Sequence, residues 1–334
     1  MNKVDTIKGK RILFMTPPFF GYEKIIPNKM RELGAIVDYY DARSITKAFD
    51  RALLKVSPNI FSGKTNKYFE NMLNEFKGKD YNYILIQNCE MITGEILTKF
   101  RKAFPNAKLI LYLCDTVKNI KGITKKNNYF DNILSFDLGD TKKYNDMIFR
   151  PLFYADCYRQ DIKSDNKYKY DLCFIGTIHS DRYKVIKNVK KICDQYKMKC
   201  FMHCYLQSDF IYIYYKLTKK EFFNAKKSEF THEKLSSTDI ARIVNDSRVV
   251  LDIQHPKQAG LTMRTIEMLG MNKKLITTNK SIKDHEFYNE NNILVIDRKN
   301  VRIDKSFFNS PYQKNDDDIY NKYSIESWLR EILL

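Results

Sequence analysis

The sequence has no features of a membrane-spanning or secreted chain. None of its apolar runs approaches the roughly 18 uninterrupted residues that a helix needs to cross a bilayer. The N-terminal stretch MNKVDTIKGKRILFMTPPFF has a short apolar run and no small-residue cleavage site after it, unlike a signal peptide. The seven cysteines are an odd number scattered along the chain, which is typical of reduced thiols. These absences predict a cytoplasmic protein.

Common motifs for nucleotides and metals are also missing. Neither GxGxxG nor the P-loop motif occurs, which argues against a dinucleotide dehydrogenase and a P-loop enzyme. The acidic run at 316–318 lies in the polar segment YQKNDDDIYNK, where a solvated run is expected. Cys200 and Cys204 lie on the opposite face of a predicted strand from His203, and no second ligand pair for zinc is visible. We therefore expect neither a metal nor a cofactor.

What the chain does have is positive charge. Its formal net charge is +18, from 58 Lys and Arg against 40 Asp and Glu. Such a balance predicts an anionic partner, and nucleic acid, anionic lipid and a phosphorylated substrate all qualify. The lysines are spread over the whole sequence without forming a basic arm. Charge alone therefore does not identify the partner.

Apolar runs alternate with helical patterns along the chain, which predicts parallel sheets with helices between the strands. The 334 residues suffice for two domains. In the first domain, 1–153, strands are expected at 11–16, 36–42, 81–88, 108–115 and 132–136. After a polar linker at 154–171, the second domain, 154–315, has expected strands at 170–176, 198–205, 249–253, 273–279 and 292–297. Residues 316–334 end in a helical pattern. The predicted fold is α/β, with two Rossmann-like domains facing across a cleft lined by the loops after the strands.

The first informative loop is FIGTIHSDRYK at 174–184. Gly176 is expected to end a strand, and SDRYK to open a helix with its Ser or Asp as the N-cap. In a functional interpretation, Gly176 and Thr177 let the backbone approach a diphosphate, which His179 and Arg182 contact. The alternative is an ordinary turn with an exposed arginine.

The second loop is HPKQAGLTMRTIE at 255–267. Gly260 allows a tight entry to a helix that Thr262 can cap, which leaves backbone N–H groups at the positive end of the helix dipole. Arg264 and Glu267 are three residues apart and share a helix face. They either pair on a solvated surface, where the pair is worth little, or bind a phosphate and the two ribose hydroxyls. The second alternative describes a nucleotide site.

The order strand, His-Pro, Gly260-Leu261-Thr262-x-Arg264-x-x-Glu267, helix, KKLITTN resembles the donor-binding region of GT-B glycosyltransferases. Within that fold it is similar to bacterial lipopolysaccharide and capsule transferases, CgeB-like proteins with a C-terminal domain of the glycosyltransferase family 1 type. SIESWLREI resembles their closing helix, which returns toward the N-terminal domain. The resemblance implies a metal-independent, hexosyltransferase-like enzyme. Its donor would be a nucleoside-diphosphate sugar, and its acceptor a glycan or a lipid-linked glycan.

By this resemblance, Glu267 matches the second glutamate of a Glu, seven residues, Glu signature that holds the ribose in retaining members. The first glutamate falls at Ala259, so retention and inversion both stay open. An inverting enzyme needs a general base. Asp115 and Glu90 follow predicted strands of the first domain, and His255 follows one of the second. Each can alternatively be an ordinary loop or capping residue.

The segment SDFIYIYYKLTKKEFFNAKK at 208–227 mixes aromatic side chains with lysines. It either lies on an anionic membrane surface or forms a buried helix with snorkelling lysines. A membrane surface would suit a lipid-linked acceptor. Two rival functions remain, a basic nucleic-acid-binding protein and a catalytically silent sugar-nucleotide-binding scaffold. No nucleic-acid-binding module is present, which makes nucleic acid the less favoured partner.

Overall fold

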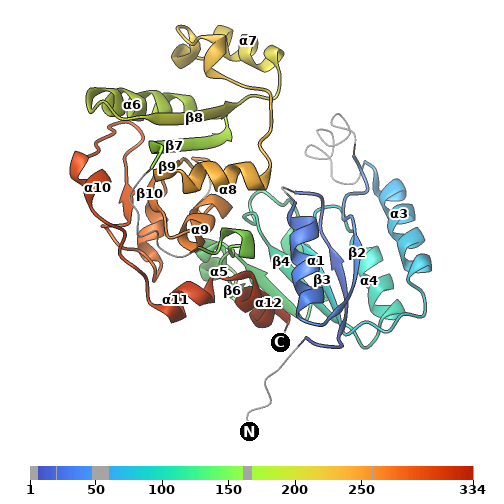
Figure 1. Ribbon diagram of the computed structural model, residues 1–334. Coiled ribbons are helices and arrows are strands. Elements are labelled where there is room, and N and C mark those ends of the chain that lie inside the picture. The colour runs from blue at the N-terminus through green and yellow to red at the C-terminus, as the bar shows by residue number, and fades with distance from the viewer. Residues whose placement is uncertain (1–6, 20, 47–59, 161–167, 257–258, 334) are drawn as a thin grey trace. The chain divides into compact units, whose positions relative to one another are not determined.

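The computed structural model describes residues 7–19, 21–46, 60–160, 168–256 and 259–333 (Figure 1). The chain divides into two compact units. Unit 1 consists of Met1–Leu152 with Ile325–Leu334, and unit 2 of Phe153–Ser324. The terminal segment 316–334 is therefore shared between them. Positions 161–167 of the expected linker and 257–258 of the second loop lie outside the described residues.

Unit 1 contains a six-stranded, all-parallel sheet in the order β2-β1-β3-β4-β5-β6. Its strands are β1 (Arg11–Met15), β2 (Ile36–Tyr40), β3 (Tyr83–Gln87), β4 (Lys108–Leu113), β5 (Asn132–Ser135) and β6 (Ile148–Phe149). The five strands expected from the apolar runs are confirmed. β6 was not expected, because two residues are too few to form an apolar run.

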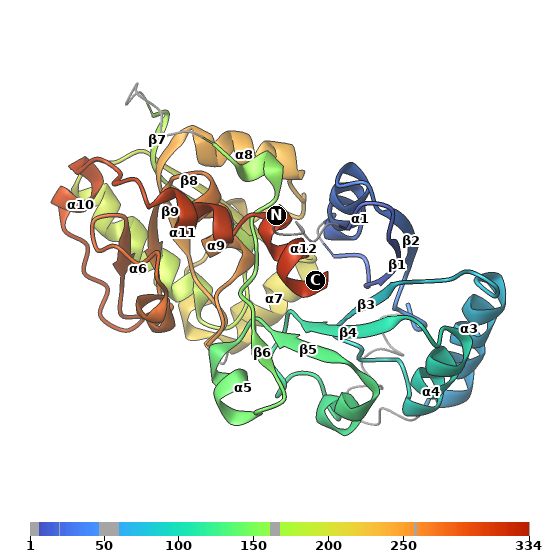
Figure 2. The same ribbon diagram turned by 90° about the horizontal axis from the view of Figure 1, so that it is seen from below.

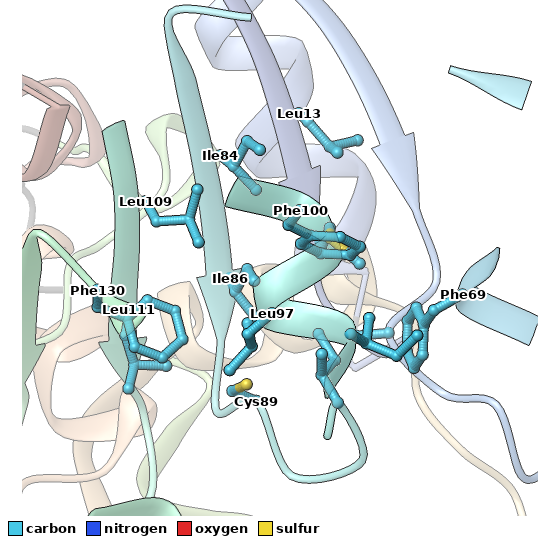
Figure 3. Close-up of a cluster of buried hydrophobic side chains, with 14 of the residues drawn as sticks. Leu13, Phe69, Ile84, Ile86, Cys89, Leu97, Phe100, Leu109, Leu111 and Phe130 are labelled. Carbon is cyan, nitrogen blue, oxygen red and sulfur yellow. The ribbon is translucent and has the colours of Figure 1, made fainter. Parts of the chain in front are cut away.

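Helices cover both faces of this sheet (Figure 2). They are α1 (Tyr22–Glu32), α3 (Ser62–Glu75), α4 (Gly94–Ala103), α5 (Leu138–Lys143) and α12 (Ile325–Leu333). Side chains alternate between the faces along each strand. Leu13, Ile84 and Leu109 face the side of α3 and α4, where they join a buried cluster with Phe69 and Phe100 (Figure 3).

The C-terminal helix α12 packs on the opposite face of this sheet. Trp328 of α12 is fully buried, and its ring meets that of Tyr112 edge-on, with the centroids 4.9 Å apart. Arg150 is also buried, and its Nε lies 2.8 Å from a carboxylate oxygen of Glu331. The terminal helix is thus an integral layer of unit 1.

Unit 2 contains a five-stranded, all-parallel sheet in the order β11-β10-β9-β7-β8. The strands are β7 (Tyr170–Thr177), β8 (Cys200–Tyr205), β9 (Ser247–Asp252), β10 (Lys274–Thr277) and β11 (Ile293–Val295). All five expected strands are confirmed, and with them the α/β class of two Rossmann-like units. The helices are α6 (Arg182–Gln195), α7 (Asp209–Thr218), α8 (Ser237–Asn245), α9 (Met263–Gly270), α10 (Lys305–Asn309) and α11 (Asp317–Lys322).

The strand order of unit 2 has one topological switch point. The chain passes from β7 outward to β8 and then returns to β9 on the other side of β7. In sheets of this order, ligands bind beyond the carboxyl ends of the two strands at the switch. The loops after β7 and β9 are the two that the sequence singled out. No helix among the described residues has the length and apolarity needed to span a bilayer.

Candidate functional site

The loop after β7 is tight. Gly176 and Thr177 are the last two residues of β7, so Gly176 lies within the strand and does not end it. Ser180 has a left-handed backbone, with φ of 51°. Asp181 occupies the N-cap position of α6 but makes no capping hydrogen bond. Its carboxylate lies 2.6 Å from the guanidinium of Arg298, in the loop after β11. The loop is thereby tied to a second strand end.

Arg182 ties the same loop to β9. Its Nε donates to the carbonyl of Ile253 at 2.6 Å, and Nη1 donates to the carbonyl of Thr177 at 2.9 Å. Burial lowers the pKa of the guanidinium, opposed by the carboxylate of Asp252. The alternative of an exposed turn arginine is therefore wrong. Arg182 holds together the carboxyl ends of the two strands that flank the switch point.

Two histidines meet at this point. The rings of His179 and His255 have centroids 5.4 Å apart and are inclined by 36°. Burial, together with the neighbouring charge of Arg182, lowers the pKa of His179 to about 4. His179 is therefore a neutral hydrogen-bonding group at physiological pH. The ammonium of Lys219, which follows α7, donates to the carbonyl of Ser180 at 3.2 Å.

The loop after β9 is anchored before it enters α9. The amide of Asn279, after β10, donates to the carbonyls of Ala259 and Gly260 at 3.1 and 3.3 Å. Gly260 and Leu261 are both buried. This anchoring fixes the direction in which α9 begins.

Thr262 is the N-cap of α9, as the sequence predicted. Its Oγ1 accepts from the backbone N–H of Thr265 at 3.1 Å and donates to the Asp252 carboxylate at 2.6 Å. Asp252 also accepts from the hydroxyl of Thr265 at 3.0 Å. The last residue of β9 therefore fixes the first turn of α9, whose leading N–H groups form a positive dipole end.

Arg264 and Glu267 form an ion pair with 2.9 Å between Nη1 and Oε2. Burial alone would lower the pKa of Arg264, but the charge of Glu267, together with weaker contributions from Tyr158 and Asp252, outweighs it and the pKa is raised. Glu267 is only 6% exposed. The pair expected by one alternative therefore exists, but it is buried and does not lie on a solvated surface.

The two remaining acidic candidates lie at strand ends of unit 1. Asp115 follows β4, and its Oδ1 accepts from the backbone N–H of Thr116 and the amide of Asn119, both at 2.8 Å. Glu90 follows β3 and is exposed, next to Cys89 with its left-handed φ of 44°. Both belong to unit 1, whereas His255 belongs to unit 2.

Three contributors to the site were missed from the sequence. Asp252 and Arg298 follow the same rule as the predicted residues, because each lies at or just beyond the carboxyl end of a strand. An inspection of the residues at the end of every predicted strand would have identified both Asp252 and Arg298. Lys219 comes from beyond a helix and has no such signal. In the described ranges, no three His, Cys, Asp or Glu side chains gather as a metal site, and metal independence stays a prediction.

Comparison of the sequence with protein-family models and with curated proteins finds no match. Among solved structures, an alpha-glucosyltransferase in complex with UDP and a 13-mer DNA is similar, with 12% identity, a TM-score of 0.59, and coverage of 97% of this chain and 94% of that one. HepE of Anabaena in complex with UDP-glucose has 11% identity, a TM-score of 0.58, and coverage of 96% and 98%.

The lipopolysaccharide outer core galactosyltransferase WaaB, in its apo form, has 12% identity, a TM-score of 0.52, and coverage of 96% and 95%. These likenesses extend over nearly the whole chain. They agree with the two parallel sheets and show that the chain has the GT-B fold.

Proposed function

We propose that the protein is a metal-independent, hexosyltransferase-like glycosyltransferase of the lipopolysaccharide or capsule type. It moves a sugar from a nucleoside-diphosphate sugar to a glycan or lipid-linked acceptor in bacterial surface polysaccharide synthesis, at the cytoplasmic face of the membrane. One observation carries the proposal. The loops after β7 and β9, far apart in sequence, are joined at the switch point by the hydrogen bond from Arg182 to Ile253 and by the His179–His255 contact.

The donor binds to unit 2. Its diphosphate lies at the N-terminus of α9, where backbone N–H groups and the helix dipole favour negative charge. Neutral His179 donates a hydrogen bond to a phosphate oxygen. On binding, the diphosphate competes with Glu267 for the guanidinium of Arg264. The carboxylate released from the buried pair accepts hydrogen bonds from the two ribose hydroxyls, which accounts for both residues of the ion pair.

Catalysis consists of orientation and charge stabilisation. A hydroxyl oxygen of the acceptor forms a bond to the anomeric carbon as the bond from that carbon to the diphosphate oxygen breaks. The hydroxyl proton passes to a base, and the helix dipole with Arg264 stabilises the departing diphosphate. Asp115, Glu90 and His255 are the candidates for that base in an inverting reaction.

The structural neighbours support a nucleotide donor, because one was solved with UDP-glucose and another with UDP. A second candidate function is favoured by the net charge of +18. It is the binding or modification of nucleic acid, for which the neighbour solved with DNA provides a parallel. Ala259, in place of the first glutamate, favours a third candidate, a scaffold that binds the sugar nucleotide without catalysis.

A transfer assay separates these functions. The purified protein is incubated with labelled sugar nucleotides and, in separate reactions, a lipid-linked glycan extract, a surface polysaccharide and DNA. Label moving to a glycan or lipid fraction is the expected result. Label moving to DNA would establish the second candidate, and saturable donor binding without transfer or hydrolysis the third.

A further inference from the structure

Exposed apolar side chains gather on one short segment of unit 2. Nine large apolar side chains are exposed in the described part of the chain, and five of them lie between 210 and 223. Their exposed fractions are 74% for Phe210, 54% for Ile213, 52% for Tyr214, 76% for Leu217 and 56% for Phe223. We call these five residues the α7 patch. Figure 1 shows α7 at the outer edge of unit 2, beyond α6 and β8.

The patch follows from the helical spacing. Phe210, Ile213, Tyr214 and Leu217 occur at i, i+3, i+4 and i+7, so they share one face of α7. The opposite face, with Ile211, Tyr212 and Tyr215, packs against the core of unit 2. No residue of α7 is fully buried. The alternative of a buried helix is therefore wrong, and α7 has a second apolar face that the unit itself does not cover.

The segment that carries the patch is rich in lysine. The segment 208–227 contains five lysines and only two carboxylates. Of these carboxylates, Asp209 is already paired with Lys227 and His232. Lys216, Lys220 and Lys226 are exposed. The surface therefore combines an apolar stripe with positive charge, which fits an anionic surface that also has an apolar interior.

We propose that the α7 patch docks on an anionic phospholipid bilayer. The ten residues of α7 span roughly 15 Å, so the helix lies in the plane of the interface. Phe210 and Leu217 enter the acyl boundary, the ring of Tyr214 lies at headgroup level, and the lysines contact lipid phosphates. A protein partner fits less well, because charged residues are depleted at the centres of protein interfaces, whereas the segment that carries this patch has the exposed lysines Lys216, Lys220 and Lys226.

The docking surface is connected to the candidate donor site. Lys219, at the C-terminal end of α7, donates to the carbonyl of Ser180 in the loop after β7. Its ammonium also lies 3.7 Å from the ring centroid of Tyr215. Docking on α7 therefore brings this loop close to the bilayer, where a lipid-linked acceptor would be. That consequence rests on the proposed function, whereas binding of vesicles does not.

Vesicle cosedimentation tests the proposal with the full-length protein. One set of vesicles is pure phosphatidylcholine, and the other contains phosphatidylglycerol as well. The test variant is Phe210→Gln with Leu217→Gln, which removes the two most exposed apolar side chains. The matched control is Ile36→Thr with Ile148→Thr, which removes two exposed apolar side chains from unit 1. A third variant, Lys220→Gln with Lys226→Gln, removes charge and leaves the patch intact.

The wild type and the control should bind vesicles containing phosphatidylglycerol and bind pure phosphatidylcholine weakly. The test variant should bind about tenfold or more weakly with an unchanged melting temperature. The lysine variant should lose several-fold in affinity, and added salt should weaken wild-type binding. Equal binding by wild type and test variant would overturn the proposal. The proposal would also be overturned if the wild type did not bind vesicles. This holds for a monomeric wild type and for one that forms a dimer through the patch, which the test variant would abolish. Binding of a sugar nucleotide is measured on the same proteins. It shows whether the proposed donor site is wrong independently of the proposed membrane docking.

Discussion

Arg182 and Arg298 both direct their guanidinium groups at the backbone of the loop after β9. Arg182 donates to the carbonyl of Ile253 and Arg298 to that of Gln254. Such bonds to buried carbonyls position a loop and, at the same time, keep positive charge close to it. The sequence left two alternatives for Arg182, a phosphate contact or an exposed residue of an ordinary turn. It could not reveal the partner of Arg182 at Ile253, which lies 71 residues further along the chain, just beyond β9.

The lowered pKa of His179 makes stability depend on pH. In the unfolded chain the imidazole takes up a proton near pH 6.5, whereas in the folded protein it does so only near pH 4. Between these values the unfolded state binds more protons, so stability falls as the pH falls from about 6.5 to about 4. His179→Gln should remove this component. Because the ring is only partly buried and solvent screens its interactions, the component is about 1 kcal/mol.

Urea unfolding of the wild type and His179→Gln at pH 7, 6, 5 and 4 measures the effect. The free energy of unfolding of the wild type should decline relative to that of the variant across this series. A difference that stays constant with pH would show that His179 is protonated equally in both states.

Asp115 provides the second prediction at this scale. If it is the base of an inverting reaction, Asp115→Asn should lower kcat by about 10²–10⁴-fold, because the amide cannot take up the acceptor proton. The amide oxygen can still accept from Thr116 and Asn119, so folding should be retained. Steady-state kinetics and donor binding measure the two effects. Glu90→Gln is the comparison, and a kcat loss confined to it would assign the base to Glu90.

Helix α9 connects the sheet to the proposed diphosphate site. The threonine before a helical pattern predicted the N-cap at Thr262, because capping depends on local sequence. The burial of Glu267 was not predictable in this way. It depends on parts of the chain far away in sequence that pack on α9, such as residues 156–158. Helix periodicity gives the face that Arg264 and Glu267 share, but not what covers it.

Removing the cap should destabilise unit 2. Thr262→Ala deletes the acceptor for the Thr265 N–H and one of the two hydroxyl donors to buried Asp252. The expected loss is about 2 kcal/mol in the free energy of unfolding. Thr262→Ser retains both hydrogen bonds and should stay within about 0.5 kcal/mol of the wild type. Urea unfolding followed by circular dichroism measures both. An Ala variant as stable as the Ser variant would show that the cap contributes nothing.

On the scale of the whole molecule, the sequence predicted ten of the eleven strands found in the described residues, because strands buried on both faces form continuous apolar runs. β6 was missed because it is short, and its place at the sheet edge depends on pairing with β5. The helical pattern near the end of the chain predicted α12. Its membership of unit 1 comes from long-range packing on Tyr112.

Trp328 should therefore matter more to stability than its position at the end of the chain suggests. Trp328→Ala removes a fully buried side chain from the layer on Tyr112, and the expected loss is about 3–5 kcal/mol in the stability of unit 1. Trp328→Phe retains an aromatic ring and should lose much less. Urea unfolding of both variants by circular dichroism gives the comparison. Equal, small losses would mean that α12 does not close this face in solution.

The most direct test of a nucleotide site at the β7–β9 switch point is the melting temperature with UDP, GDP, CDP, ADP, TDP and CMP. A ligand at 100 to 1,000 times its Kd stabilises the folded state by about 2.7–4.1 kcal/mol. The test variant is Glu267→Ala, and the control is Glu290→Gln, at an exposed position of the same unit. With a donor site at this point, one nucleoside diphosphate should raise the melting temperature of the wild type and the control, and raise that of Glu267→Ala much less. No shift with any nucleotide, or an equal shift in all three proteins, would contradict such a site.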